Sequence, residues 1–266
     1  MSAIDGAPPY SVQNEANRYR DIHKILRSED VYGSGFQSPG GISGFNEVLG
    51  GFMELRPGMT ILDIGSGLGG AAIHLARHFD VHVIGIDTAP LMCEIARSRN
   101  SEIASNQRVT FINGTIFDLE KMCIDFDLIY SRDALMYDSA KNLTFLECYK
   151  LLKKSGRIVI SDFCGSLGDE HFAQYVNTCG YHLLTIKEYA ETLSSAGFKI
   201  ERQDDISSIA KQQLESDLTR YLSNEFEGRS DTTDEDSKHL SKRWRLKIDY
   251  LDRGWLTQGR FIAAKT

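Results

Sequence analysis

The chain has 266 residues, of which 41% are hydrophobic and five are cysteines, and it carries a formal net charge of −7. This length can bury one substantial core, and the acidic balance lacks the basic excess that follows nucleic-acid phosphates, so we expect a single domain over 1–266 and no nucleic-acid partner. The cysteines are odd in number and scattered along the chain, which argues against a disulfide scaffold. Residues 1–10 are polar, unlike a signal peptide, and no apolar run is long enough to span a membrane. These features predict a cytoplasmic protein with free thiols.

The first predicted element is an amphipathic helix at 13–27, and a glycine-rich loop follows at 32–41. Both precede the sheet that the next segments predict. We interpret residues 11–51 as an N-terminal helical lid with an entrance loop.

From residue 60 onward, predicted strands alternate with helices. The strands are expected at 60–64, 82–86, 109–112, 128–131 and 157–161. The helices between them are expected at 70–78, 90–99 and 140–152. This alternation predicts an α/β fold, a Rossmann-like parallel sheet with helices on both faces.

After the fifth strand, residues 163–189 form a segment that is too long for a simple crossover and is rich in aromatic and polar side chains. An insertion there would overhang the carboxyl ends of the strands, so we interpret it as a cap over the substrate. The remaining expected elements are a helix at 186–196, a strand at 199–203, helical stretches at 206–225 and 234–251, and a closing strand at 260–264.

The sequence Leu62-Asp63-Ile64-Gly65-Ser66-Gly67-Leu68-Gly69-Gly70 joins the first strand to the first crossover helix. Glycine allows the unusual backbone angles of such a turn, and a Cβ there would collide with an approaching ligand. The spacing of Gly65, Gly67 and Gly70 also fits the dinucleotide fingerprint, so a nicotinamide cofactor is one hypothesis.

Two carboxylates near this turn bear on the choice of cofactor. Asp63 places a negative charge at the strand end, where it would repel a pyrophosphate and attract the cationic amino-acid portion of S-adenosylmethionine. Asp87 ends the second strand about 20 residues further on, where a carboxylate can accept both ribose hydroxyls of either cofactor. The alternative is that the two residues only cap a turn and a helix.

Two other patterns carry little weight. His74, His78 and His82 have helical spacing, but His82 falls in the next predicted strand, so we expect no metal site. The nucleophile elbow of serine hydrolases is absent from the sequence.

The fourth strand ends in Tyr130-Ser131-Arg132-Asp133, polar residues at the point where it would open into a cleft. Together with the glycine-rich turn, the loop at 32–41, Ser161-Asp162-Phe163-Cys164 and residues 175–181, this sequence resembles the phosphoethanolamine N-methyltransferases, a family of class I S-adenosylmethionine-dependent methyltransferases. The resemblance runs from about Arg18 to Lys265. The glycine-rich turn is common to all class I methyltransferases, whereas the other motifs are more specific.

The resemblance implies a set of residues for each role. S-adenosylmethionine would be held by Asp63, Gly65, Ser66, Gly67, Asp87, Thr88, Thr115, Ile116 and Arg132. A phosphobase, phosphoethanolamine or its mono- and dimethyl forms, would contact Gln37, Ser38, Asp133, Tyr175, Tyr181 and Lys247. The implied catalytic residues are Tyr19, Asp133 and Tyr137. We expect the protein to act as a monomer.

The chain departs from the family pattern at four positions. The catalytic histidine of the family falls on Tyr137, a phosphate-contacting tyrosine on Phe163, a phosphate-binding arginine on Cys179 and an adenine-side aspartate on Thr115. Because an arginine binds phosphate through two directed hydrogen bonds, its loss leaves another amine or a hydroxyl as an alternative acceptor. The lost histidine leaves a second alternative, a catalytically silent regulatory subunit that binds the cofactor.

The chemistry requires an unprotonated amine. A primary amine has a pKa near ~10.4, so it must lose a proton before it attacks the methyl group. Tyr19 and Tyr137 are candidates for relaying this proton, while Asp133 orients the ammonium group. The alternative is that Tyr137 only lines the wall and that water accepts the proton.

Overall fold

The computed structural model describes residues 26, 29–50, 54–102, 106–223 and 234–266. Within these residues, seven strands form one sheet in the order β3-β2-β1-β4-β5-β7-β6. The strands are β1 (Thr60–Ile64), β2 (His82–Asp87), β3 (Val109–Asn113), β4 (Phe126–Arg132), β5 (Leu152–Gly165), β6 (Lys199–Asp205) and β7 (Leu256–Ala264).

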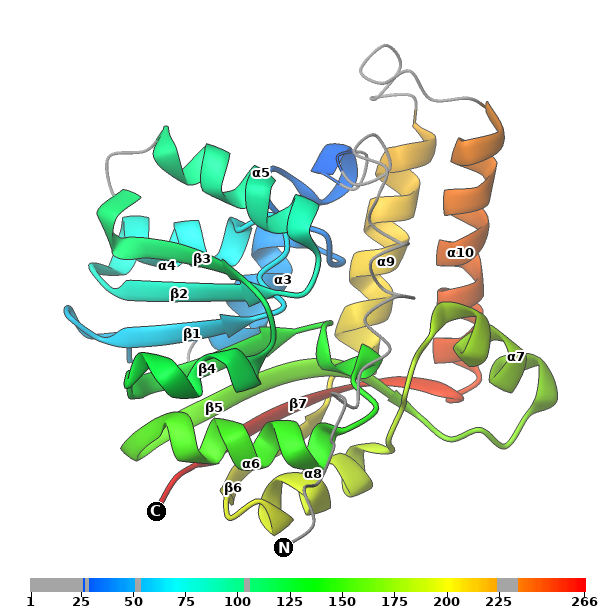
Figure 1. Ribbon diagram of the computed structural model, residues 1–266. Coiled ribbons are helices and arrows are strands. Elements are labelled where there is room, and N and C mark those ends of the chain that lie inside the picture. The colour runs from blue at the N-terminus through cyan, green and yellow to red at the C-terminus, as the bar shows by residue number, and fades with distance from the viewer. Residues whose placement is uncertain (1–25, 27–28, 51–53, 103–105, 224–233) are drawn as a thin grey trace, which may run out of the picture.

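Helices surround this sheet on three sides (Figure 1). The α-helices are α3 (Gly41–Leu49), α4 (Gly70–Phe79), α5 (Pro90–Ser101), α6 (Lys141–Leu151), α7 (Glu170–Cys179), α8 (Ile186–Ser195), α9 (Ser207–Leu222) and α10 (Asp234–Asp252). Short 3-10 helices are η1 (Asn106–Arg108), η2 (Ile116–Asp118), η3 (Glu120–Met122) and η4 (Leu135–Tyr137). Helices α3, α4 and α5 cover one face of the sheet, α6 and α8 cover the other, and α9 with α10 stands beside the carboxyl ends of the strands.

The predicted parallel sheet is confirmed for β1 to β5, whose neighbouring strands all run in the same direction. The last two strands differ from this pattern, because β7 lies between β5 and β6 and is antiparallel to both. Strand β5 is also longer than the predicted 157–161, since it pairs with β7 from Arg157 to Gly165. Residues 162–165 therefore belong to the strand because their backbone pairs with β7. Their side chains alone do not predict a strand there.

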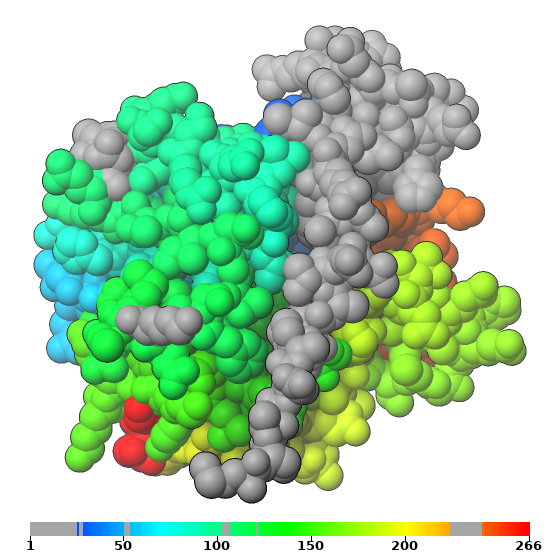
Figure 2. Space-filling view, viewed as in Figure 1, coloured from blue at the N-terminus to red at the C-terminus, as the bar shows by residue number. Residues whose placement is uncertain are grey.

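The N-terminal and insertion segments are described in part. The predicted helix at 13–27, apart from residue 26, lies outside the described residues, and so does Tyr19. In the predicted insertion at 163–189, the first three residues complete β5 and the last four begin α8. Between them lies α7, which stands out from the edge of the molecule beside α10 (Figure 2).

Three apolar clusters hold these layers together. Phe145 of α6 and Tyr189 of α8 pack with the strands on one face, and Phe45 of α3 packs with α4 and the strands on the other. The third cluster contains Phe163 at the end of β5 and Trp244 of α10, together with side chains of α7 and α9. This third cluster fixes α7, α9 and α10 over the carboxyl ends of the parallel strands, where open α/β sheets bind their ligands.

Two further findings concern environment. Among the helices that the structure describes, none combines the length and the apolar character needed to cross a bilayer. All five cysteines lie within the described residues, and each is a free thiol, as the sequence predicts.

Candidate active site

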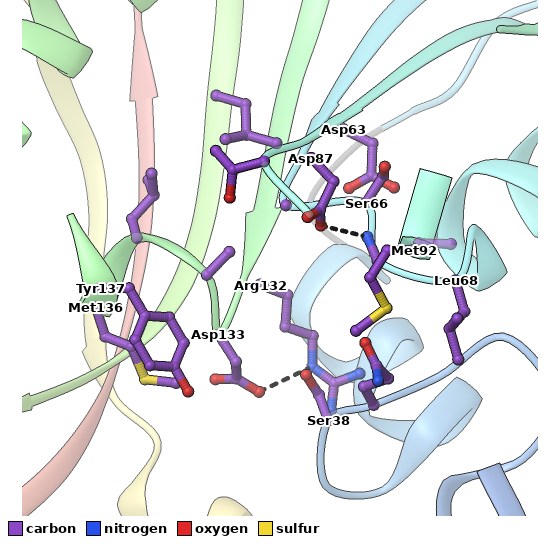
Figure 3. A pocket seen from close by; sticks show the side chains of 18 of the residues that line it. Ser38, Asp63, Ser66, Leu68, Asp87, Met92, Arg132, Asp133, Met136 and Tyr137 are labelled. Carbon is purple, nitrogen blue, oxygen red and sulfur yellow. Dashed lines mark hydrogen bonds and ion pairs between the residues drawn. The ribbon is translucent and has the colours of Figure 1, made fainter. Parts of the chain in front are cut away.

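A cavity of about 420 Å³ opens at the carboxyl ends of the parallel strands. Its walls come from the glycine-rich turn after β1, the ends of β2, β3 and β4, the entrance loop (residues 32–41) and α10. Figure 3 shows Asp63 and Asp87 on one side of this cavity and Tyr137 with Met136 on the other. A volume of this size is in the usual range for small-molecule sites.

The entrance loop is tied to the glycine-rich turn by backbone contacts. The Gly70 amide donates to the Gly35 carbonyl at 3.1 Å, and the Gly35 amide donates to the Glu29 carboxylate, which also binds Arg99 at 2.5 Å. A Cβ at Gly35 would lie 2.5 Å from the Gly70 Cα, so only glycine permits this approach. The wall that this loop forms is therefore built before any ligand arrives.

Arg132, at the end of β4, also holds the entrance loop. Its Nη1 donates to the Gly41 carbonyl at 2.9 Å and its Nη2 donates to the Pro39 carbonyl, while Nε lies 3.8 Å from a carboxylate oxygen of Asp133. The residue lines the cavity as the resemblance implies, but two guanidinium nitrogens are bound to backbone carbonyls. Its direct contact with a cofactor stays a prediction.

The glycine-rich turn adopts left-handed backbone angles, with φ of 73° at Gly65 and 51° at Gly67. A Cβ at Gly65 would lie 2.2 Å from the Cβ of Ala134, and one at Gly67 would lie 3.1 Å from Oε1 of Gln37. Glycine is therefore required at Gly65 by the loop after β4, a reason that the sequence does not reveal.

Asp63 is a buried carboxylate and Asp87 a half-buried one, and they lie on the same wall (Figure 3). Asp63 is 2% exposed, and its Oδ2 has no hydrogen-bond partner among the described residues. Burial, together with the charge of Asp87, raises the pKa of Asp63 to about 7. Burial also raises the pKa of Asp87, whose oxygens accept hydrogen bonds from the amides of Gly67 at 2.8 Å and Ala89 at 2.9 Å. A cationic ligand would stabilise both carboxylates, whereas a pyrophosphate would be repelled.

Apolar side chains line the same cavity: Leu68 after β1, Met92 of α5 and Ile116 of η2, which we call the apolar slot. Thr88 and Thr115 line the cavity as well. The Thr115 hydroxyl donates to Asp118 at 3.0 Å and caps η2, which presents Ile116 to the cavity. These residues, with Asp63 and Asp87, fit a cofactor that carries an adenine, a ribose and a positive charge.

Asp133 follows β4 in the left-handed region, with φ of 52°. Its amide donates to the Ser161 carbonyl at 2.9 Å, and its Oδ1 accepts a hydrogen bond from Nε2 of Gln258 at 2.8 Å. The same Gln258 nitrogen donates to the Ser161 hydroxyl at 2.8 Å. Gln258 lies in β7, 125 residues from Asp133, and no sequence motif indicates it. This network holds the Asp133 carboxylate in one orientation.

Tyr137 and Tyr181 lie together at the far side of the cavity, with ring centres 5.2 Å apart. The buried Lys141 fixes both segments, because its Nζ donates to the Asp138 carbonyl at 2.7 Å and to the His182 carbonyl at 2.5 Å. Burial lowers the pKa of Lys141. Sequence reasoning misses this lysine, since nothing in the pattern distinguishes it from a surface lysine of α6.

The predicted phosphate-binding residues are only partly brought together. Lys247 and Tyr181 line the cavity, and Nζ of Lys247 lies 4.3 Å from the ring centre of Phe163. Tyr175 lies behind Tyr181, at 6.0 Å between ring centres, and neither Tyr175 nor Cys179 is among the cavity-lining residues. Gln37 and Ser38 of the entrance loop line the cavity as expected.

The histidine pattern does not form a cluster. His74 and His78 stack on α4 at 4.2 Å between ring centres, while His82 begins β2. In the part of the chain that the structure describes, no group of three or more histidine, cysteine or acidic side chains is arranged to hold a metal ion.

Comparisons with known proteins place this site in a family. Residues 55–216 match the family described as methyltransferase domain. The phosphoethanolamine N-methyltransferase of Plasmodium falciparum is 32% identical over 256 residues, which cover 94% of each chain. The chain belongs to the phosphoethanolamine N-methyltransferase family.

Another family member, the phosphoethanolamine N-methyltransferase of Triticum aestivum, is 32% identical over 254 residues. These residues cover 92% of this chain but 48% of the wheat protein, so the chain spans about half the length of that relative. A solved family structure, Haemonchus contortus phosphoethanolamine N-methyltransferase 2 with phosphomonomethylethanolamine and S-adenosylhomocysteine, superimposes with a TM-score of 0.87 at 25% identity. That match covers 96% of this chain and 60% of the nematode chain.

The raised pKa of Asp63 predicts how the stability of the protein depends on pH. Because the pKa rises from 3.8 to about 7 on folding, the native state holds a proton that the unfolded chain releases, and this contribution to stability is lost as pH rises from about 4 through 7. The Asp63→Asn variant lacks this loss. Urea unfolding should therefore show wild type losing on the order of 2 kcal/mol relative to Asp63→Asn between pH 5 and 8. Parallel curves for the two proteins would contradict the assignment.

The Gln258 network predicts a loss of turnover. Replacing Gln258 with leucine removes the amide that orients Asp133 while keeping a similar volume, so kcat for the methyl acceptor should fall about tenfold and cofactor affinity should stay unchanged. The matched control is Gln203→Leu, an exposed position on the neighbouring strand β6. Steady-state kinetics with calorimetric cofactor binding makes the comparison. Equal kcat values for the two variants would remove Gln258 from the account.

Proposed function

We propose that the protein is an S-adenosylmethionine-dependent N-methyltransferase that methylates phosphoethanolamine or its mono- and dimethyl forms toward phosphocholine. The observation that carries the proposal is the charge arrangement in the cavity. The carboxylates of Asp63, Asp87 and Asp133 line the strand ends, and Lys247 lines the opposite wall on α10. This arrangement is complementary to a cationic donor and to an acceptor with one positive and one negative end.

The donor end of the cavity supports S-adenosylmethionine rather than a nicotinamide dinucleotide. Asp87 would accept the ribose hydroxyls, and Asp63 would attract the cationic amino-acid portion. Leu68, Met92 and Ile116 would hold the adenine in the apolar slot. When bound, S-adenosylmethionine supplies an electrophilic methyl group on a positively charged sulfur. The dinucleotide is disfavoured because its pyrophosphate would face the carboxylates of Asp63 and Asp87.

At the acceptor end, Asp133 is the positioning charge. Its side chain is 8% exposed and is oriented by Gln258, so it can accept a hydrogen bond from the acceptor ammonium and stabilise the cation that remains after transfer. Methyl transfer by in-line displacement depends mainly on alignment, and the fixed walls described above supply that alignment.

The acceptor nitrogen must also lose a proton. Tyr137 lines the cavity where the family has its histidine, and its hydroxyl is a candidate for passing the proton onward, with Tyr19 as a second candidate outside the described residues. A tyrosine is a poorer proton acceptor than a histidine near neutral pH. We therefore expect either that the preferred acceptor has a lower amine pKa or that water carries the proton away.

One observation favours a second candidate, a methyltransferase for an unphosphorylated amine or a hydroxyl. Phe163 presents an apolar ring to the cavity, and Cys179 does not line it, so two of the implied phosphate contacts are absent from the described site. A silent cofactor-binding subunit is the remaining alternative, motivated by Tyr137. We further propose that the enzyme works as a monomer in the cytoplasm, a reducing compartment consistent with its free thiols.

A methyl-transfer assay with S-adenosylmethionine tests the proposal. The acceptors are phosphoethanolamine, its mono- and dimethyl forms, and the matching amines without phosphate. The proposal expects turnover with at least one phosphobase and a much lower kcat/KM for the matching amine. Turnover of the amines alone would favour the second candidate, and cofactor binding without any turnover would favour the silent subunit.

Tyr137 provides a gain-of-function prediction. The Tyr137→His variant installs a better proton acceptor. Its kcat with phosphoethanolamine should therefore exceed that of wild type by roughly tenfold once the pH is above about 6.5, where the histidine is neutral. Tyr137→Phe is the matched control, because it keeps the ring and removes the hydroxyl. The measurement is kcat across about pH 6 to 9, a range that spans the histidine pKa. An unchanged or lower rate for Tyr137→His would show that this position does not handle the proton.

A further inference from the structure

We infer that Arg243 of α10 binds the phosphate of the acceptor together with Lys247, and so supplies the guanidinium that the family pattern has at the position of Cys179. The inference rests on the proposed function, because it concerns how that same site recognises its substrate. Nothing in the resemblance assigns Arg243 a role.

Few positively charged side chains in the described part of the chain line the cavity. Among the described residues that line the cavity, the lysines and arginines are Arg132, Arg243 and Lys247. Two nitrogens of the Arg132 guanidinium are already bound to the carbonyls of Pro39 and Gly41. The positive charges that face the cavity without such backbone contacts in the described structure are therefore both on α10.

These two cationic residues are close together on α10. Arg243 and Lys247 are four residues apart, so they lie on the same face of the helix with Cβ atoms about 5–6 Å apart. One phosphate can contact both. Lys242 and Arg245 of the same helix are exposed and do not line the cavity.

Helix α10 is anchored next to Arg243. Trp244, next to Arg243, is 4% exposed and donates its indole hydrogen to the Tyr32 hydroxyl at 2.7 Å. Tyr32 belongs to the entrance loop, so this bond joins α10 to that loop. Tyr32 and Arg243 both line the same cavity.

Lys247 alone offers a phosphate a point charge without paired hydrogen bonds. Its ammonium lies 4.3 Å from the ring centre of Phe163 and 5.9 Å from that of Tyr181, so two aromatic faces hold it in place. An ammonium is a point charge, and Phe163 has no hydroxyl to add a directed bond. A guanidinium binds phosphate through two parallel hydrogen bonds, and Arg243 can provide this geometry from the same wall.

The resulting site has opposite ends. The α10 wall carries Arg243 and Lys247, while the carboxylate of Asp133 faces the cavity at the end of β4. A phosphobase would then lie with its phosphate toward α10 and its nitrogen toward the strand ends. Arg243 is thus a specificity-determining residue for phosphorylated amines.

The test compares Arg243→Ala and Arg243→Lys with the matched control Arg245→Ala. Arg245 lies on the same helix and is exposed, so its loss changes the net charge of α10 equally without touching the cavity. Calorimetry measures binding of phosphomonomethylethanolamine to protein saturated with S-adenosylhomocysteine, and kinetics gives KM and kcat for the same phosphobase. Inhibition by the amine without phosphate is measured in parallel.

The expected result for Arg243→Ala is a 10- to 100-fold rise in Kd and KM for the phosphobase, of the order for losing charge-assisted hydrogen bonds, with an unchanged cofactor Kd. Arg243→Lys should lie between this variant and wild type, because it keeps the charge and loses the paired bonds. Arg245→Ala should match wild type, and no variant should change inhibition by the unphosphorylated amine.

The two hypotheses fail in different ways. If wild type binds no phosphobase, the proposed function fails and the inference fails with it. If wild type binds phosphobase and Arg243→Ala binds it as Arg245→Ala does, the inference is overturned while the function stands. An equal loss of affinity for phosphobase and unphosphorylated amine would also overturn it, since the effect would not concern the phosphate. Arg243→Lys, which preserves charge and length, decides the question even if the alanine variant folds poorly.

Discussion

The candidate active site depends on one physical constraint: carboxylates at the ends of parallel strands, held largely out of water, need a positive partner. Parallel order brings the ends of β1, β2 and β4 to the same edge, where Asp63, Asp87 and Asp133 meet one cavity. Burial raises the pKa of both Asp63 and Asp87, so their charged forms are less stable here than in water. A cationic ligand would stabilise these charged forms, so the fold itself creates a preference for positively charged groups.

The rest of the cavity is built to keep its shape. The entrance loop is bound to the glycine-rich turn through Gly35 and Gly70, to β4 through Arg132, and to α9 through a hydrogen bond from the Gly40 amide to Asp217 at 2.8 Å. Lys141 joins the segments that carry the two facing tyrosines. Walls fixed in this way suit a reaction in which alignment of nitrogen, methyl and sulfur supplies most of the rate.

The sequence predicts the part of the site that local chain chemistry determines. A buried strand, a glycine-rich turn and a helix follow one another at residues 60–79, and Asp63 and Asp87 lie where strand ends must place them. The resemblance adds Asp133, Tyr137, Tyr181 and Lys247, all of which line the cavity. These residues belong to motifs or to element ends, where position follows from the chain itself.

The residues that sequence reasoning misses reach the site through long-range packing. Gln258 approaches Asp133 only because β7 inserts next to β5, and the antiparallel placement of β7 has no signature in the alternating pattern. Arg243 faces the cavity because Trp244 docks on Tyr32, more than two hundred positions earlier in the chain. Tyr175 shows the opposite case: the resemblance implies a contact with substrate, and the structure places its ring 6.0 Å from that of Tyr181 and outside the cavity lining, so the contact stays a prediction.

The cavity has a negative end at the strand ends and a positive end on α10. A crystal structure of the protein with S-adenosylhomocysteine and phosphomonomethylethanolamine tests this polarity directly. We expect the acceptor nitrogen beside the Asp133 carboxylate and the phosphate between Arg243 and Lys247. A phosphobase bound in the reverse orientation, or a phosphate that contacts neither cation, would contradict it.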